Sequence, residues 1–108
     1  MINMVKFIEN LNEFKDVMRN SEGKLVVVDF TASWCGPCKH IAPKFEQLSK
    51  DNTDVLFFKV DVDANSETSE DQEISCMPTF KFYKNGEVLH VMEGADEKGL
   101  VAKILELK

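Results

Sequence analysis

The chain of 108 residues has few cysteines, histidines and prolines, with three, two and three of them. An odd and small number of cysteines argues against the disulfide scaffold that holds many small secreted domains together. Uninterrupted apolar runs are also short, and none approaches the roughly 20 residues that cross a bilayer. The few cysteines therefore favour a redox or metal role over a structural one.

Positive charge is scarce as well, because 13 basic residues face 19 acidic ones and leave a net charge of −6. This balance argues against nucleic acid or an anionic membrane as the main partner. Charged residues such as Lys6, Glu9 and Glu13 interrupt the N-terminal segment, so no secretory apolar region fits there and we expect a cytoplasmic protein. The length and the 44% hydrophobic content predict one globular domain over residues 1–108.

The most informative segment is residues 34–38, Trp-Cys-Gly-Pro-Cys, which lies between an apolar run and a helix-like stretch. Two cysteines at this spacing can close a small disulfide. A helix N-terminus carries partial positive charge and free N–H groups, which stabilise a thiolate, so Cys35 is the predicted nucleophile. Cys38 shares helical spacing with Ile41, Phe45 and Leu48, so it is predicted to face the core as the resolving thiol.

Hydrophobic periodicity and turn residues predict alternating strands and helices along the rest of the chain. Asn10 and Glu13 resemble a capping box at the start of the first helix, and Asn85-Gly86 predicts a type I′ hairpin turn. The expected elements are a strand at 2–7, a helix with Leu11, Phe14, Val17 and Met18 on one face, a central buried strand at 25–30, a helix after Cys38, a second buried strand at 55–62, a short helix within 65–73, a hairpin of 79–83 with 88–92, and a final helix with Leu100, Ile104 and Leu107 on one face.

Residues 34–38, with Asp29 in the preceding strand and Met77-Pro78-Thr79 at the start of the hairpin, resemble the thioredoxin family, the standard example of this motif. Cys76, directly before Met77, further resembles the cytosolic animal type. The resemblance covers the element order from end to end. It implies an α/β thioredoxin fold, with a central mixed five-stranded β-sheet flanked by four helices.

The same resemblance implies a general thiol–disulfide oxidoreductase that reduces protein disulfides through a reversible Cys35–Cys38 dithiol/disulfide. The chain has no nucleotide-binding motif, so we expect it to bind no cofactor and to receive electrons from NADPH through a flavoprotein thioredoxin reductase. The other implied partners are disulfide-containing proteins, for example peroxiredoxin-like ones.

Asp29 and Lys59 each interrupt an apolar strand. Burial of a carboxylate raises its pKa, and strand alternation places Asp29 on the same face as Leu25 and Val27. By resemblance, Asp29 would exchange a proton with Cys38, and Lys59 matches the family's lysine near that acid. A strand-end acid in water and a lysine that extends to the surface are the plainer alternatives.

The resemblance also predicts a small, flat, apolar docking surface around Cys35. Pro78 matches the family's cis proline, and a cis peptide there would expose the backbone of Met77 for pairing with an extended substrate. The residues assigned to substrate binding are Trp34, Gly36, Pro37, Met77, Pro78, Thr79, Gly94 and Ala95.

Cys76 is either an inert small hydrophobe or an exposed regulatory thiol. In the second case, the protein is a monomer that forms a Cys76-linked dimer on oxidation. Thr68 and Ser69 stand where the family commonly has small apolar residues, so the helix in 65–73 is expected to be short or frayed.

Four other functions are alternatives. A zinc pair needs two further ligands, which only Cys76, His40 and His90 could supply, and a cysteine protease would leave Cys38 without a role. An oxidase or isomerase of the disulfide isomerase kind fits the Gly-Pro pair between the cysteines and the acidic Asp29 less well. A binding module gated by its redox state stays open.

Overall fold

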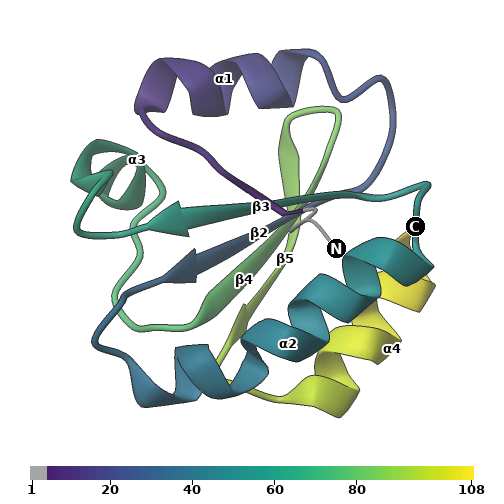
Figure 1. Ribbon diagram of the computed structural model, residues 1–108. Coiled ribbons are helices and arrows are strands. Elements are labelled where there is room, and N and C mark those ends of the chain that lie inside the picture. Colours follow the sequence, from purple (N-terminus) through teal and green to yellow (C-terminus); the bar gives the residue numbers. More distant parts are fainter. Residues whose placement is uncertain (1–4) are drawn as a thin grey trace.

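In the computed structural model, which describes residues 5–108, a five-stranded sheet lies between two pairs of helices (Figure 1). The predicted order of elements is confirmed, although residues 2–4 of the expected first strand lie outside the described residues. The elements are β1 (Lys6–Phe7), α1 (Leu11–Arg19), β2 (Val26–Thr31), α2 (Gly36–Asp51), β3 (Leu56–Asp61), α3 (Ser66–Asp71), β4 (Thr79–Lys84), β5 (Glu87–Glu93) and α4 (Glu97–Leu107).

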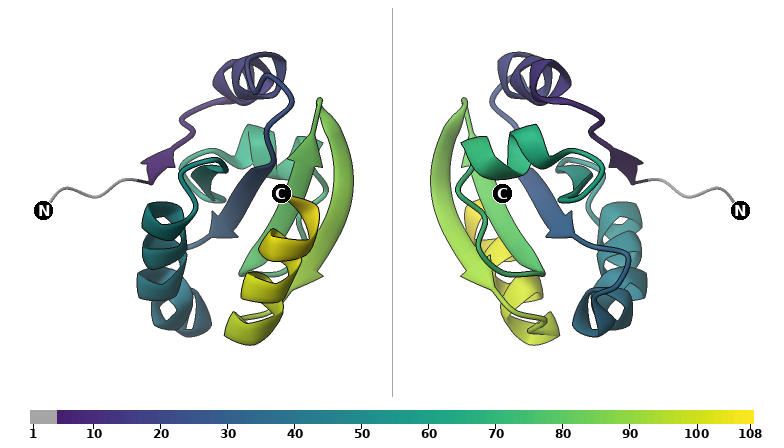
Figure 2. Two further views of the ribbon diagram at one scale, coloured as in Figure 1. Left: turned by 90° about the vertical axis from the view of Figure 1, so that its right-hand side faces the viewer. Right: turned by 90° about the vertical axis from the view of Figure 1, so that its left-hand side faces the viewer.

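The strands are ordered β1-β3-β2-β4-β5, so β2 is the middle strand, as predicted from its apolar sequence. It pairs in parallel with β3 and antiparallel with β4, while β1 is parallel to β3 and β5 antiparallel to β4. Figure 2 shows β1 and the β4–β5 hairpin at opposite edges of the twisted sheet. The mixed five-stranded sheet of the thioredoxin fold is therefore confirmed.

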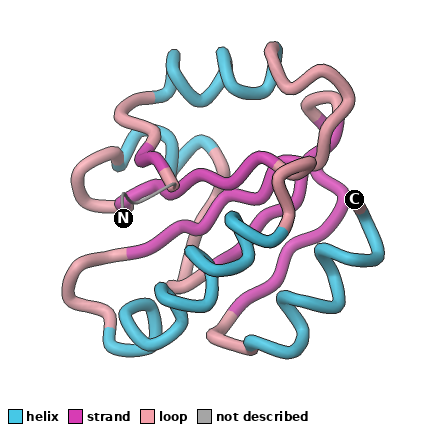
Figure 3. The backbone as a smooth tube through the Cα atoms, turned by 45° about the vertical axis from the view of Figure 1, so that its right-hand side comes forward, coloured by secondary structure: helices cyan, strands magenta, loops and turns pink. Residues whose placement is uncertain are grey.

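Helices cover both faces of the sheet, and each face has its own core (Figure 3). On one face, α2 and α4 supply Phe45 and Leu100, and the Phe45 ring lies 5.6 Å from that of Phe80 between ring centroids. On the other face, Phe14 of α1 packs edge to face on Tyr83. Within residues 5–108, no helix is long and apolar enough to cross a membrane.

The prediction of a second buried strand at 55–62 was wrong about burial, because the strand is present but only partly buried. Within β3 only Phe57 and Val60 are buried, and the other residues are half-buried. The reason is position: the outer neighbour of β3 is the two-residue strand β1, which leaves β3 close to an edge of the sheet.

Local signals in the sequence correctly predicted a helix start and a turn. The Asn10 side chain accepts a hydrogen bond from the Glu13 backbone N–H at 2.9 Å, while the Glu13 carboxylate bonds the N–H of Glu9. Asn85 and Gly86 have φ values of 53° and 79°, both positive as a type I′ turn requires.

Helix α3 has six residues, which confirms the expectation of a short helix. Thr68 and Ser69 are nevertheless buried, at 0% and 8% exposure. Among the described residues, the Thr68 Oγ1 atom has no hydrogen-bond partner. A buried hydroxyl without a partner costs free energy, so this position is a weak point of the helix.

Replacing Thr68 by valine removes that hydroxyl and keeps the shape of the side chain. We expect Thr68→Val to raise the free energy of unfolding by about 1 kcal/mol in urea denaturation. Thr53→Val, at an exposed position before β3, serves as the control and is expected to change stability by less than about 0.5 kcal/mol. A loss of stability in Thr68→Val would show that the hydroxyl is satisfied in solution.

Candidate functional site

The two motif cysteines form a disulfide at the N-terminus of α2. Cys35 is the N-cap residue, and its Sγ accepts a hydrogen bond from the backbone N–H of Cys38 at 3.1 Å. Proline is well suited to the first turn of a helix, where its missing N–H has no partner to lose, and Pro37 occupies that place. Cys38 is 2% exposed, which confirms that it faces inward.

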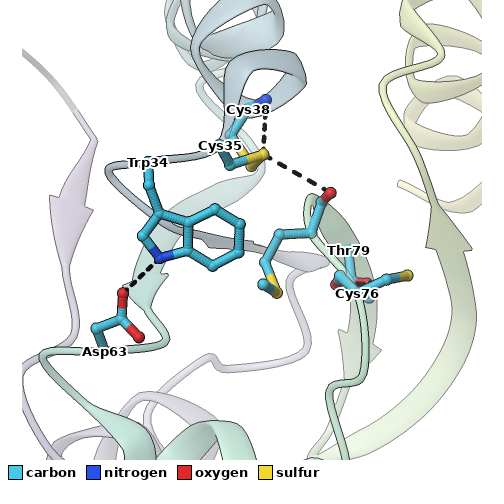
Figure 4. Close-up of a disulfide and its surroundings, with 7 residues drawn as sticks. Trp34, Cys35, Cys38, Asp63, Cys76 and Thr79 are labelled. Atoms are coloured by element: carbon cyan, nitrogen blue, oxygen red, sulfur yellow. Dashed lines mark hydrogen bonds between the residues drawn. A yellow bond between two sulfur atoms is a disulfide. The ribbon is translucent and has the colours of Figure 1, made fainter.

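The loop before β4 lies against this disulfide. The Cys35 Sγ atom is 3.7 Å from the carbonyl oxygen of Met77, the contact drawn as a dashed line in Figure 4. The Met77–Pro78 peptide bond is cis, as the resemblance predicted. A residue 42 positions away in the sequence therefore presents a backbone acceptor at the reactive sulfur.

The predicted docking residues differ in exposure. Trp34 is 65% exposed, which excludes a core role for its side chain. Gly36 and Pro37 are exposed, Met77, Gly94 and Ala95 are half-buried, and Pro78 and Thr79 are buried. Six of the eight residues are thus at least partly accessible for the predicted docking surface, whereas Pro78 and Thr79 are buried.

Gly94 connects the two loops of this surface. Its N–H donates to the Pro78 carbonyl at 2.9 Å, and its φ of +100° lies in a region that side chains rarely adopt. The positive φ favours glycine at this position, which is what a turn glycine requires, and its role in substrate binding stays a prediction.

Trp34 is held by a residue that the sequence analysis did not single out. Its indole N–H donates to the Asp63 carboxylate at 2.8 Å, and Figure 4 shows the indole nitrogen turned toward that side chain. Trp34 follows β2 and Asp63 follows β3. The carboxyl ends of parallel neighbouring strands meet at one edge of a sheet, which places both residues at that edge, but the hydrogen bond between them depends on how the side chains pack.

Asp29 is buried in the middle of β2, with 1% of its surface exposed. Its Oδ1 atom has no hydrogen-bond partner among residues 5–108. Desolvation raises the pKa of this carboxyl from 3.8 to about 7, because burial disfavours the charged form. Asp29 therefore carries its proton at mildly acidic pH and is close to half ionised at neutral pH.

Lys59 lies beside Asp29 in the sheet, since the two residues are partners in the β2–β3 register. Its positive charge lowers the pKa of Asp29, although less than burial raises it. The ion pair of Lys59, however, is with Glu46 of α2, at 3.3 Å between Nζ and Oε2. Glu46 was missed because its only sequence signal is its place directly after the buried Phe45.

Cys76 is a free thiol on the same loop as Met77, and it is half-buried. Its Sγ lies 3.8 Å from the Thr79 hydroxyl, which donates to the Cys76 carbonyl at 2.7 Å. The half-buried position therefore decides neither for an inert hydrophobic residue nor for an exposed regulatory thiol. Among the described residues, no group of three or more His, Cys, Asp or Glu side chains could hold a metal ion.

Comparison with known proteins identifies the family. The model of the family described as thioredoxin matches residues 5–106. The chain belongs to the thioredoxin family. A curated thioredoxin of Geodia cydonium is 51% identical over 106 residues, covering 97% of this chain and all of the relative. One of Ictalurus punctatus is 53% identical over 107 residues, with 97% of this chain and all of the relative covered.

Solved structures of the family agree with the fold. The crystal structure of Fasciola hepatica thioredoxin matches with a TM-score of 0.94 and 39% identity, covering 96% of this chain and all of that one. Thioredoxins are thiol–disulfide oxidoreductases, and this chain has its Cys35–Cys38 disulfide at the active-site spacing. The chain is thus a thiol–disulfide oxidoreductase of the thioredoxin type.

The buried acid of this thioredoxin-family site makes stability depend on pH. Between pH 3.8 and about 7 the unfolded chain loses the Asp29 proton first, so stability falls as the pH rises through this window. Above pH 7 the burial of the ionised Asp29 carboxylate lowers the free energy of unfolding by its full amount, up to roughly 4 kcal/mol at 1.36 kcal/mol per pKa unit.

Asp29→Asn replaces the ionisable carboxyl by a neutral amide and so removes the cost of burying a charge. We expect urea denaturation of the oxidised protein to show the variant more stable than the parent at pH 8 by up to roughly 4 kcal/mol, with the gain largely gone at pH 4. Asp51→Asn, at an exposed position of α2, controls for the lost charge. A pH-independent difference between Asp29→Asn and the parent would contradict the raised pKa.

Proposed function

We propose that this protein is a general reductase of protein disulfides and that an NADPH-dependent flavoprotein thioredoxin reductase recycles it. The observation that carries the proposal is the Cys35–Cys38 disulfide, which lies at the N-terminus of α2 directly after the exposed Trp34, with Cys35 5% and Cys38 2% exposed. Such a small apolar surface suits many partners weakly, and the reductase would bind to it as well.

In the reducing direction, the Cys35 thiolate attacks one sulfur of a substrate disulfide. The new bond is a mixed disulfide, and the other substrate sulfur leaves as a thiolate that takes up a proton. Cys38 then attacks the Cys35 sulfur, the mixed disulfide breaks, and the second substrate sulfur leaves. The substrate gains two electrons and two protons, and the protein becomes the disulfide form.

We assign to Asp29 the removal of the proton from the Cys38 thiol before the second attack. A general base works best when its pKa lies near the working pH, and the pKa of Asp29 is raised to about 7. Cys38 is buried, which supports a role that begins only after the substrate is attached to Cys35.

Substrate binding is assigned to the two loops around the disulfide. The Met77 carbonyl, beside the Cys35 sulfur, would accept a hydrogen bond from the backbone of an extended substrate segment. Peroxiredoxin-like proteins are proposed substrates. A solved structure that is 33% identical to this chain, with a TM-score of 0.90, concerns the thiol resolving mechanism of a yeast mitochondrial 1-Cys peroxiredoxin via glutathione/thioredoxin systems.

We further propose that the protein acts as a monomer in the cytoplasm and that Cys76 links two copies on oxidation. The net charge of −6 favours a monomer, and Cys76, the single free thiol among the described residues, is the group that could form the link. Reduction at this site would not require that thiol.

Equilibration against glutathione redox buffers, with alkylation of the free thiols, tests the reducing direction. Thioredoxins are the reference case at about −270 mV, and we expect the Cys35–Cys38 pair to fall near that known value, below a glutathione pool at about −220 to −260 mV. A potential near −180 mV or above would favour isomerase or oxidase work. Failure to form the disulfide would leave the redox-gated binding module.

Serine variants separate the nucleophile Cys35 from the free thiol Cys76. We expect Cys35→Ser to abolish the reductase-coupled reduction of insulin disulfides, followed by NADPH consumption, because it removes the nucleophile. Cys76→Ser should retain nearly full turnover and lose any oxidation-dependent dimer on a non-reducing gel. A loss in Cys76→Ser as large as that in Cys35→Ser would contradict the assigned roles.

A further inference from the structure

Three charged side chains meet on the face of the sheet that α2 covers. Asp29 and Lys59 are neighbours on β2 and β3, and Glu46 reaches them from α2. The side chains of Lys59 and Glu46 are 12% and 23% exposed, and Asp29 is 1% exposed. Two carboxyl groups therefore compete for one ammonium group in a largely apolar region.

The ammonium group is paired with Glu46. Its Nζ atom lies 3.3 Å from Glu46 Oε2, an ion pair without hydrogen-bond geometry, because Glu46 Oε2, like Asp29 Oδ1, has no hydrogen-bond partner among the described residues. Among those residues, Lys59 forms this ion pair with Glu46 and none with Asp29. The attraction between two opposite charges that are partly shielded from water is stronger than between the same charges at the surface, although their desolvation offsets part of it. Lys59 consequently acts on Asp29 only through its charge, and part of that charge is balanced by Glu46.

We propose that Glu46 is a positioning residue for the buried acid of the site: by pairing with the Lys59 ammonium, it leaves Asp29 without an ion-pair partner and disfavours the ionised form of that carboxyl. The assignment concerns the protonation of Asp29 itself. Only its importance for turnover rests on the proposed function of Asp29 in removing the Cys38 proton.

The surroundings of Asp29 leave few other groups that could have this effect. Lys59 is the charged group that faces it from β3, and Glu46 is the one from α2. Cys38, also on α2, carries no charge in the disulfide. The neighbouring residue on β4 is Phe80, and α4 contributes the apolar Leu100 to this core.

Glu46 disfavours the ionisation of Asp29 in two ways. Its negative charge disfavours a second negative charge on Asp29, and its ion pair with Lys59 holds the compensating cation. Removing only the charge of Glu46 should therefore favour the ionised form of Asp29 on both counts.

Glu46→Gln makes this change with almost no change in shape, and a half-buried position tolerates it. The Asp29 carboxyl is titrated by carbon-13 NMR in the oxidised protein, without substrate or reductase. We expect the midpoint, near pH 7 in the parent, to fall by about one pH unit or more in the variant. Glu46→Ala, which removes the whole carboxylate, should shift the midpoint in the same direction and serves if Glu46→Gln does not fold.

Glu70→Gln is the matched control, since it removes one exposed carboxylate on α3 and should leave the Asp29 midpoint unchanged. Lys59→Met should move the midpoint upward, and in that background Glu46→Gln should have a smaller effect because no cation remains to be released. An Asp29 midpoint in Glu46→Gln equal to that in Glu70→Gln would overturn the assignment.

The pH profile of insulin reduction separates this assignment from the proposed function. A downward shift of the profile in Glu46→Gln, parallel to the NMR shift, supports both. A shifted Asp29 midpoint with an unchanged profile supports the Glu46 assignment and contradicts the proton transfer assigned to Asp29.

Discussion

The pairing of β2 on both of its edges is the constraint on which the site depends. β3 and β4 hydrogen-bond to this strand, and each of the three strands contributes to the site at one end or in its middle. The loop after β2 carries the disulfide, the segment after β3 carries Asp63, and the segment before β4 carries Met77. Because β4 runs antiparallel to the other two, its start lies beside their ends, and distant residues meet at one edge of the sheet.

The same central position explains the electrostatics. A strand covered on both faces excludes water from Asp29, and the exclusion of water changes the pKa of this carboxyl more than any neighbouring charge does. The carboxyl is thus costly to bury as an anion, which is the kind of stability cost that functional sites commonly carry. Lys59 on β3 lowers the free-energy cost of ionising Asp29, and Glu46 on α2 raises it.

Much of this arrangement could be predicted from the sequence, because local rules control it. The apolar composition of residues 25–30 predicted the central strand, Asn85-Gly86 predicted the turn, and helical spacing predicted that Cys38 faces inward. Contacts between distant residues could not be predicted in this way. The hydrogen bond of Trp34 to Asp63 and the ion pair of Lys59 with Glu46 depend on how elements pack, and the exposure of β3 depends on the length of its outer neighbour.

The hydrogen bond from the Gly94 N–H to the Pro78 carbonyl has a consequence for recognition. It joins the loop before β4 to the loop after β5, so two backbone segments of the docking surface are ordered before any partner arrives. A partner then gives up mainly its own conformational entropy on binding, and little is spent on ordering the protein. If substrates bind there as proposed, discrimination among them would depend more on the accessibility and flexibility of the substrate's disulfide than on mutual adjustment.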